Sequence, residues 1–364
     1  MNVPSDSSAA DSSAADPVAV SVAEHDASAQ RLPPRSEVVA PGVTTIALPL
    51  PEGPNVPYTL AYLIADAEGA PHLIDPGWDS PENEQRIERA LADQGWTVAD
   101  LRTITVTHLH GDHLGLADVL RERSGARVVL HRAEQAAIDA LVEASPTRVE
   151  RVLAQADQWD VPADRVAELT KVAERSAHIH PFTTDALVDD GDLLDIPGRR
   201  IRVVHTPGHT PGHMTLVDDT DPTARLVFTG DHVLPTVHGG LGLGGETARN
   251  ALAEVLDSLR RVAQLDGNPG DGPGGSLSDG VQVCPGHEYR FRGLAARCAA
   301  IEEHHLGRSQ EIAEARDELD DPTVYAIASR VHWSPGWENM RGFVLLSALQ
   351  QTAMHLEFLL EEDL

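Results

Sequence analysis

Short apolar and β-branched runs, each followed by a turn signal, dominate the chain from residue 38 onward. A turn rich in Pro, Gly and Asn separates the first two runs, which is typical of antiparallel strand pairs. Leu101, Ile104 and Val106 indicate a buried strand that ends in a polar segment. The pattern predicts strands at 43–48, 58–64, 72–74, 101–106, 127–130, 186–188, 193–196, 201–205, 214–217, 226–229 and 281–284.

Helical periodicity appears between these strands. Ile87 and Leu91 lie at helical spacing in a polar stretch, and Ser80-Pro81 offers an N-cap followed by Pro at the first helical position. Residues 132–180 carry apolar faces that predict two or three helices, and further helices are predicted at 246–264 and beyond residue 293. Strands and helices in this order favour an α+β fold with two sheets sandwiched by helices.

The chain divides into three parts on composition. Residues 1–36 are rich in Ser, Ala and Asp and predict a disordered leader without a signal peptide. Residues 37–292 form the body, in which 132–180 is a helical insertion and 266–280 a Gly/Pro-rich loop. Residues 293–364 form a small helical C-terminal module whose apolar faces could serve a homodimer.

Composition and charge exclude several protein classes. The chain has 364 residues, 41 % of them hydrophobic, which is enough to build a core. No apolar run reaches the roughly 18 residues needed to cross a bilayer, so no membrane partner is expected. The formal charge of −29 repels phosphate backbones and disfavours nucleic acid as a partner. Two cysteines, Cys284 and Cys298, cannot form a disulfide framework, and we expect a cytoplasmic protein.

The densest chemical signal follows the strand at 101–106. In His108-Leu109-His110-Gly111-Asp112-His113, four side chains of metal-ligand type lie within six residues. Imidazole nitrogen and carboxylate oxygen suit zinc, and the i, i+2 spacing points two imidazoles the same way. Gly111 permits a sharp turn that directs Asp112 and His113 toward a second ion. This segment predicts a metal site rather than a coincidental polar loop.

A second histidine cluster follows the strand at 201–205. Residues 205–213 read HTPGHTPGH, so two Thr-Pro-Gly-His turns each expose a histidine. We select His209 as the metal ligand and leave His205 without a role. His213 either supports the ligands from behind or only caps local backbone.

Two single residues complete the set. Asp231 ends an apolar strand in the sequence FTGD, and His287 follows another strand in PGHE. Each alone is ordinary, but four strand ends then deliver ligand-type side chains in chain order. This placement predicts one site along the rim of a two-sheet sandwich.

The ordered motifs HxHxDH, TPGHTPGH, FTGD and PGHE resemble the metallo-β-lactamase-fold hydrolase superfamily, most of all its glyoxalase II-like and lactonase-like branch. The resemblance covers about residues 38–292 and implies a four-layer αββα sandwich with a dinuclear metal centre at one edge. It implies two zinc ions per chain, with iron or manganese as alternatives. The resemblance assigns His108, His110 and His209 to the first ion, Asp112, His113 and His287 to the second, and Asp231 to both.

The same resemblance implies two further features. Asp75, in the turn LIDPG, matches an aspartate that orients the metal-binding loop. The C-terminal tail is similar to a winged-helix-like extension found on hydrolases of this fold. The true β-lactamase branch tends to use a cysteine ligand and to lack the equivalent of Asp231, so an antibiotic-degrading role is disfavoured.

Three functions are considered. The first is a hydrolase that uses a metal-bridging hydroxide to cleave an ester, thioester or lactone in a small-molecule substrate, with Asp112 accepting or relaying its proton. The second is a phosphodiesterase or endoribonuclease with the same metals, and the third is a non-catalytic, metal-dependent binding module. The insertion 132–180 is either a lid over the site, with Trp159 and Phe182 lining it, or an extra structural layer.

Overall fold

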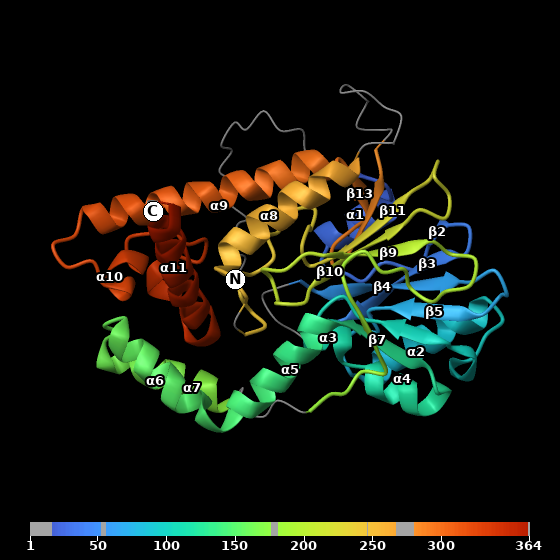
Figure 1. Cartoon of the computed structure of the whole chain (residues 1–364), viewed down its shortest axis with the longest axis horizontal. Coiled ribbons are helices and arrows are strands. Elements are labelled where there is room, and N and C mark those ends of the chain that lie inside the picture. The colour runs from blue at the N-terminus through green and yellow to red at the C-terminus, as the bar shows by residue number, and fades with distance from the viewer. Residues whose placement is uncertain (1–16, 52–55, 176–180, 246, 267–279, 363–364) are drawn as a thin grey trace.

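Two β-sheets form the centre of the molecule (Figure 1). The computed structural model describes residues 17–51, 56–175, 181–245, 247–266 and 280–362. The seven-stranded sheet has the order β2-β3-β4-β5-β6-β7-β8, antiparallel as far as β5 and parallel from β5 to β8. Its strands are β2 (Val38–Ala40), β3 (Val43–Pro49), β4 (Tyr58–Ala65), β5 (Pro71–Ile74), β6 (Thr103–Thr105), β7 (Arg127–His131) and β8 (Ala186–Val188).

The second sheet has six strands in the order β1-β13-β12-β11-β10-β9. Its neighbours are antiparallel except for β11 and β12, which run parallel. The predicted strand at 193–196 is reduced to an isolated bridge between Leu193 and Arg202. The strands of this sheet are β1 (Val18–Ala19), β9 (Ile201–His205), β10 (Met214–Asp218), β11 (Leu226–Gly230), β12 (Gln282–Pro285) and β13 (Phe291–Arg292).

Helices cover both outer faces of the sheet pair. Side chains of α2 and α4 pack on the seven-stranded sheet, and those of α8 and α9 pack on the six-stranded sheet. A third apolar cluster, with Tyr62, Phe228 and Met214 among its members, fills the space between the sheets. The predicted four-layer αββα sandwich is therefore confirmed. The α-helices are α1 (Val22–Ala29), α2 (Pro81–Asp93), α3 (Gly111–Leu114), α4 (Ala117–Ser124), α5 (Arg132–Ala144), α6 (Arg148–Gln158), α7 (Ala163–Arg175), α8 (Ala251–Ala263), α9 (Leu294–Asp317), α10 (Val324–Ala328) and α11 (Gly342–Glu362).

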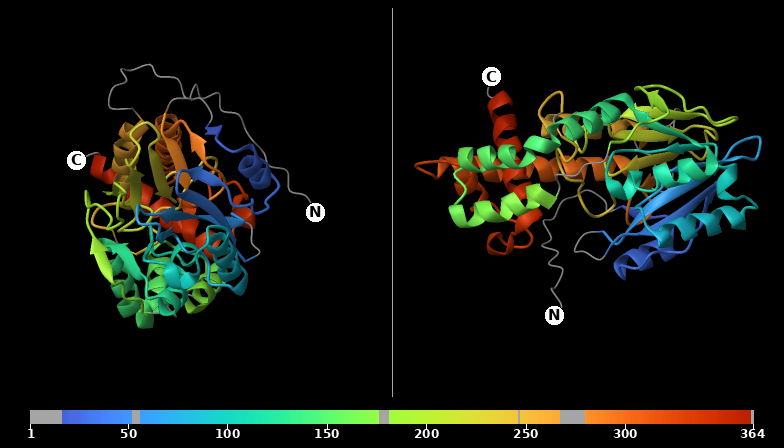
Figure 2. Two further views of the ribbon diagram at one scale, coloured as in Figure 1. Left: turned by 90° about the vertical axis from the view of Figure 1, so that its right-hand side faces the viewer. Right: turned by 90° about the horizontal axis from the view of Figure 1, so that it is seen from below.

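A helical module lies beyond one end of the sandwich (Figures 1 and 2). Helix α9 runs from the sandwich into this module, where its C-terminal half shares an apolar core with α6, α7, α10 and α11. The predicted C-terminal helical module is thus present, and its likeness to a winged helix stays a prediction. Helix α11 is the one described helix whose length and mean hydropathy meet the criteria for a membrane span; Leu345, Leu346 and Leu349 are buried in the module core.

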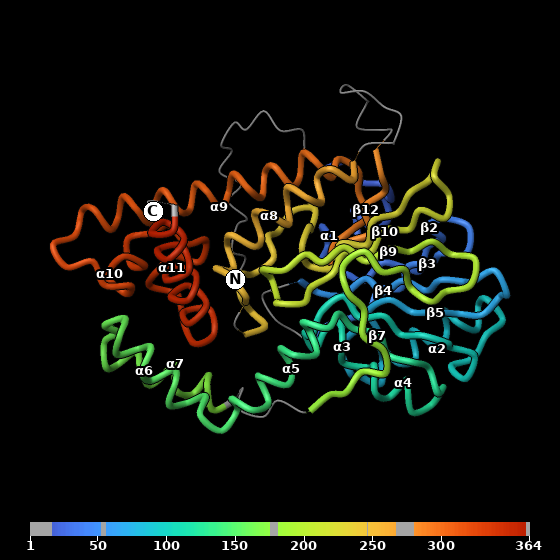
Figure 3. The backbone as a smooth tube through the Cα atoms, in the orientation of Figure 1, coloured from blue at the N-terminus to red at the C-terminus, as the bar shows by residue number. Residues whose placement is uncertain are grey.

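The insertion at 132–180 belongs to this module for most of its length. The chain leaves the sandwich along α5, and α6 and α7 then pack on the C-terminal helices (Figure 3). Trp159 is buried in their shared core, and Phe182 packs on the sandwich under Arg121. The prediction that Trp159 and Phe182 line the site is therefore wrong, because Trp159 is buried in the module core and the half-buried Phe182 packs against the core of the sandwich. Lid motion of the insertion stays a prediction, and residues 176–180 lie outside the described residues.

The N-terminal segment is ordered where the structure describes it, so the predicted leader of 1–36 is wrong for residues 17–36. β1 pairs with β13, and Ser21 caps α1 by accepting a hydrogen bond from the Glu24 backbone amide. The fully buried Glu24 carboxylate accepts hydrogen bonds from the Arg290 backbone amide at 2.9 Å and from its Nε at 2.8 Å. Composition does not reveal this pairing, because its partner lies 266 residues away. Residues 1–16 lie outside the described residues.

Candidate metal centre

The seven predicted ligands converge at one edge of the two sheets. They lie on four connections, which follow β6, β9, β11 and β12 in chain order. Each connection leaves a buried strand, so the rigid sheets determine where its side chains lie. The ligand-type atoms form two groups, within each of which all atoms lie within 4.8 Å of one another: His108, His110, His209 and Asp231, and Asp112, His113 and His287.

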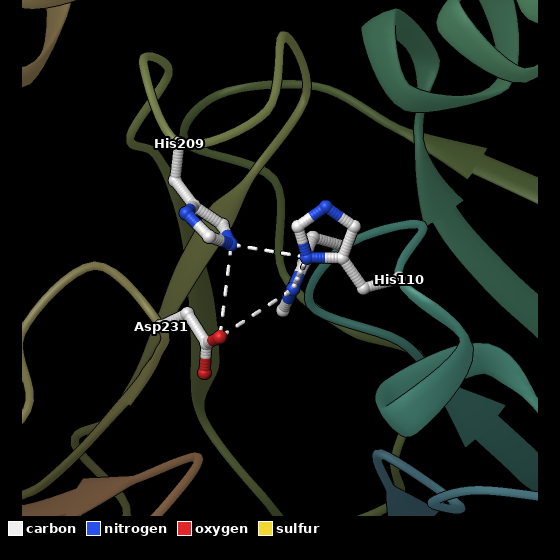
Figure 4. Close-up of side chains that lie close together, drawn as sticks. His110, His209 and Asp231 are labelled. Atoms are coloured by element: carbon white, nitrogen blue, oxygen red, sulfur yellow. Dashed lines mark hydrogen bonds and ion pairs between the residues drawn. The ribbon is translucent and has the colours of Figure 1, made fainter. Parts of the chain in front are cut away.

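In the first group, ring nitrogens of three histidines lie close together. His110 Nδ1 lies 3.0 Å from His108 Nε2 and 3.1 Å from His209 Nε2. Asp231 Oδ2 lies 3.6 Å from His209 Nε2 and 3.9 Å from His108 Nε2. Figure 4 shows His110, His209 and Asp231 directed toward one point from three separate segments. Three imidazoles and a carboxylate around one point make a donor set suited to zinc.

The second group lies on the other side of Asp231. His113 Nε2 and His287 Nε2 are 3.3 Å apart, and Asp112 Oδ2 lies 3.4 Å from His287 Nε2. Asp231 Oδ1 lies 3.3 Å from His113 Nε2 and 3.2 Å from His287 Nε2. One oxygen of Asp231 therefore faces each group, which is the arrangement needed for a carboxylate shared by two ions.

Hydrogen bonds on the far side of each ring orient the histidines. His209 Nδ1 donates to the Gly240 carbonyl at 2.7 Å, and His287 Nδ1 donates to the Tyr58 carbonyl at 2.7 Å. His113 Nδ1 lies 2.9 Å from Asp75 Oδ2. A proton on the outer nitrogen leaves the inner nitrogen with a free lone pair, which is the form that binds a metal ion.

Asp75 connects two of the metal-binding segments. The side chain is 2 % exposed and its backbone has a φ of 54°. Asp75 accepts hydrogen bonds from the Thr107 backbone amide at 2.7 Å and from Thr107 Oγ1 at 2.8 Å, in addition to its contact with His113. These contacts hold the residue before His108 and the ring of His113, as the orienting role expected for Asp75 requires.

Two structural observations indicate that the residues of this site are suited to bind divalent ions. Asp231 Oδ1 is buried and has no hydrogen-bond partner among the described residues. A Cβ atom on Gly286 would lie 2.7 Å from His113 Cε1 and 2.8 Å from Asp231 Oδ1, so the backbone before His287 approaches this point as closely as glycine allows. Two carboxylates with unused oxygen lone pairs, surrounded by imidazole nitrogens, attract cations and suit their coordination.

The pKa values of the histidines depend on their burial and on the neighbouring carboxylates. Burial by itself would lower the pKa of His287, but the carboxylates of Asp231 and Asp112 outweigh it and raise that pKa to about 10. The pKa of His113 is raised well above its usual value for the same reason. Burial lowers the pKa of His110 to about 4. The carboxylates thus act most strongly on His113 and His287, whereas burial dominates at His108, His110 and His209 and lowers the pKa of each.

Comparison with known proteins identifies the family. The model of the metallo-beta-lactamase superfamily matches residues 54–269. The chain belongs to this superfamily. It is 32 % identical over 229 residues to a hydroxyacylglutathione hydrolase of Rhodopseudomonas palustris, a match that spans 63 % of this chain and 62 % of that enzyme.

Two further members of the superfamily are similar to this chain. A hydroxyacylglutathione hydrolase of Haemophilus influenzae is 27 % identical, over 50 % of this chain and 68 % of that enzyme. The crystal structure of a metallo-beta-lactamase family protein from Thermus thermophilus is 26 % identical with a TM-score of 0.69, and the match covers 90 % of this chain and 95 % of that one. The relatives support a metal-binding hydrolase.

The three histidines of the TPGH repeat have different positions. His209 lies in the first ligand group, as predicted. His213 lies behind the ligands, where its Nδ1 lies 2.8 Å from Thr206 Oγ1 and its Nε2 accepts a hydrogen bond from the Asp231 backbone amide at 3.2 Å. His205 donates to the Pro211 carbonyl at 2.9 Å, away from both ligand groups.

Glu134 is a buried residue that the sequence interpretation missed. Its carboxylate accepts hydrogen bonds from the backbone amides of Leu109 and Gly212, both at 2.6 Å, and from Thr210 Oγ1 at 2.7 Å. Burial raises the pKa of Glu134 to about 7, and the three donors oppose that shift. A Cβ atom on Gly212 would lie 2.1 Å from the Glu134 backbone nitrogen, so the second histidine loop packs directly on α5. Glu134 thereby ties the two histidine-bearing loops of this metallo-beta-lactamase fold to one helix, although a lone glutamate in a first helical turn carries no signal of this role.

Proposed function

We propose that the protein is a dinuclear-zinc hydrolase that cleaves an ester, thioester or lactone in a small-molecule substrate. The observation that carries this proposal is the position of Asp231, whose two oxygens each face a separate group of histidine ligands. Two divalent ions at such a site supply Lewis acidity and lower the pKa of water, the chemistry that hydrolysis needs. The similarity to two hydroxyacylglutathione hydrolases supports an acyl substrate.

The proposal assigns each ligand residue to one or both of the two ions. His108, His110 and His209 would hold one ion, Asp112, His113 and His287 the other, and Asp231 both, and the close spacing of their ligand atoms supports this assignment. The hydrogen bonds behind these rings fix their orientation before substrate arrives, which lowers the reorganisation needed in the transition state. Iron or manganese suit the same oxygen and nitrogen ligands, so metal identity depends on supply as well as on the site.

Asp112 is the carboxylate that we assign to proton transfer. Its side chain is 23 % exposed, compared with 11 % for Asp231 and 3 % for Asp75. A carboxylate at the edge of the site can pass a proton to solvent, whereas the two buried ones are held by their partners. His113 and His287 outweigh the effect of burial and hold the pKa of Asp112 well below its usual value.

An enzyme that cleaves phosphodiesters would use the same ligands, and the formal charge of −29 opposes nucleic acid as its substrate. A non-catalytic metal-binding module remains the third hypothesis. The expected cytoplasmic location and the homodimer stay predictions.

Metal analysis combined with a substrate panel tests the proposal. The purified protein is expected to hold about two divalent ions per chain and to hydrolyse acyl thioesters or lactones faster than bis-p-nitrophenyl phosphate. His110→Ala and Asp112→Asn should abolish turnover, whereas the matched control Asp118→Asn, which removes a surface carboxylate paired with Arg121, should retain it. Preference for the phosphodiester would establish the second hypothesis instead. Full turnover in His110→Ala, or no turnover on any substrate at full metal content, would refute the proposed function.

A further inference from the structure

The loop after β11 contacts two of the three histidines that we assign to the first ion. The Gly240 carbonyl accepts a hydrogen bond from His209 Nδ1 at 2.7 Å, and the Leu243 carbonyl lies 3.3 Å from His110 Nε2. We call residues 232–243 the orienting loop. The position of its backbone therefore determines how two of the ligand rings are oriented.

The two carbonyls also determine which nitrogen of each ring is available to a metal ion. A ring nitrogen that donates a hydrogen bond keeps its proton, so His209 offers Nε2 and His110 offers Nδ1. These two nitrogens lie 3.1 Å apart, within the first ligand group. A displaced orienting loop would leave both rings free to turn or to change tautomer.

Regular secondary structure does not fix the orienting loop. All of residues 232–243 are described, and they contain neither helix nor strand. Backbone groups outside helices and sheets need other hydrogen-bond partners, and here side chains from distant segments supply several of them. The loop therefore depends on those side chains for its position.

Glu288 holds the loop through two consecutive residues. Its carboxylate accepts hydrogen bonds from the backbone amides of Thr236 at 3.0 Å and Val237 at 3.3 Å, and from the Thr236 hydroxyl. Glu288 is 7 % exposed, so water competes little for these contacts. The carboxylate thus restrains the loop three residues before Gly240.

Arg297, on α9, holds the same stretch by its carbonyls. Its Nε donates to the Leu234 carbonyl and its Nη2 to the Val237 carbonyl, both at 2.7 Å. Burial lowers the pKa of Arg297, and the Glu288 carboxylate opposes that shift, so the two charges act on each other. Val237 is consequently held on both sides, with its N–H bound by Glu288 and its carbonyl bound by Arg297.

The backbone of Glu288 is constrained as well. Its φ of 68° lies in the left-handed region, which costs a residue other than glycine about 1–3 kcal/mol and persists where the surroundings enforce it. The Tyr58 hydroxyl donates to the Glu288 carbonyl at 2.6 Å. The preceding residue, His287, belongs to the second ligand group, so consecutive side chains contact the second group and the loop that orients the first.

We propose that Glu288 and Arg297 are positioning residues, which together hold the orienting loop so that its carbonyls keep His209 and His110 in the orientation that binds the first ion. Neither side chain belongs to the two ligand groups, so both act through the loop. The inference rests on the proposed metal centre and concerns the first ion specifically. A purely structural role of the same pair would not distinguish between the two ions.

Zinc titration of the full chain against a chromophoric chelator measures the two dissociation constants without a substrate. His209→Ala removes a ligand of the first group and so identifies which binding step belongs to the first ion. Glu288→Ala should weaken that step about tenfold and leave the other within about twofold. Glu288→Gln should restore it, because the amide oxygen can accept from both backbone amides while its NH₂ group donates to the Thr236 hydroxyl.

Asp66→Ala is the matched control. The Asp66 carboxylate also accepts from two backbone amides, those of Glu68 at 2.9 Å and Ala70 at 2.8 Å, and it lies 3.2 Å from His72 Nε2. It is 3 % exposed and lies in the turn before β5, whereas the metal-binding segments follow the other ends of the strands. Asp66→Ala should lower the free energy of unfolding and leave both zinc constants unchanged.

A second variant keeps the test decisive if Glu288→Ala does not fold. Arg297→Lys retains the positive charge but can reach only one of the two carbonyls, so it should weaken the first-ion step about threefold, the loss of one hydrogen bond. In cobalt(II)-loaded protein, the visible absorption band that is lost in His209→Ala should change in both Glu288→Ala and Arg297→Lys and return in Glu288→Gln.

Equal first-ion constants in wild type, Glu288→Ala and Arg297→Lys would overturn the inference. Equal weakening of both steps, or the same loss in Asp66→Ala, would also overturn it, because a general loss of stability would then explain the result. Site-specific weakening in a protein that hydrolyses no acyl substrate would support the inference and refute the proposed function.

Discussion

Replacing Glu134 tests whether one buried carboxylate positions both histidine loops. The side chain is fully buried and accepts three hydrogen bonds, from the backbone amides of Leu109 and Gly212 and from the hydroxyl of Thr210. In Glu134→Gln the amide oxygen can still accept from Leu109 and Thr210, which share one oxygen of the native carboxylate. Its NH₂ group would then face the Gly212 N–H, so both of these buried donors lack an acceptor.

The magnitude follows from this count. Each buried donor without an acceptor costs about 1–3 kcal/mol, so Glu134→Gln should lower the free energy of unfolding by about 2–6 kcal/mol. Glu134→Ala leaves two backbone amides without acceptors and should cost about 2–6 kcal/mol on the same scale. Because Leu109 lies between His108 and His110, both variants should also weaken metal binding.

Urea unfolding and competitive zinc titration measure the two effects. Glu143→Gln is the matched control, since it makes the same chemical change at an exposed position of the same helix. We expect Glu143→Gln to retain wild-type stability and zinc affinity, with Glu134→Gln reduced in both. Unfolding free energies of Glu134→Gln and Glu143→Gln that agree within about 0.5 kcal/mol would refute the reasoning.

Three further predictions concern the metal centre and the N-terminal segment. Asp75→Asn should reduce zinc affinity about 10–100-fold, because it weakens the contacts to Thr107 and His113, and a competitive titration with a chromophoric chelator measures this loss. Removing bound zinc with EDTA should lower the free energy of unfolding by about 2.7 kcal/mol for each ion lost, relative to protein in zinc at 100 times the dissociation constant, and a urea melt that does not shift would contradict it. Glu24→Gln should destabilise the protein by about 1–3 kcal/mol, because the nearly buried Arg290 guanidinium then keeps only Glu37 as a charge partner, and equal urea midpoints for variant and wild type would argue against a structural role for the Glu24–Arg290 ion pair.

Local sequence motifs identified some of the candidate metal ligands but did not distinguish others. His108, His110, Asp112 and His113 lie within one short segment, and the structure places the first two and the last two in different groups of ligand-type side chains. For His205, His209 and His213 the repeat supplies three equivalent turns, and the selection of His209 came from counting ligands. The structure distinguishes these three, because the Gly240 carbonyl orients His209 while Thr206 and the Asp231 amide occupy His213.

Residues whose roles the sequence did not reveal have partners that lie far away along the chain. Glu24, Glu134 and Trp159 are each unremarkable in their local sequence, and each acquires its role from a partner far along the chain. Glu24 pairs with Arg290, Glu134 joins two loops from α5, and Trp159 packs against the C-terminal helices. Such roles depend on which segments of the chain pack against each other, and the type of a residue does not determine this packing.

The amino-acid sequence by itself determined the ligand-type residues and most of the strands and helices, because periodicity and motif spacing are local properties of the chain. Only the tertiary structure decided that residues 17–36 complete the sandwich and that the insertion shares a core with the C-terminal helices. Those outcomes depend on contacts between segments that are distant in the chain. These contacts stabilise the protein only after folding has buried the partners against each other.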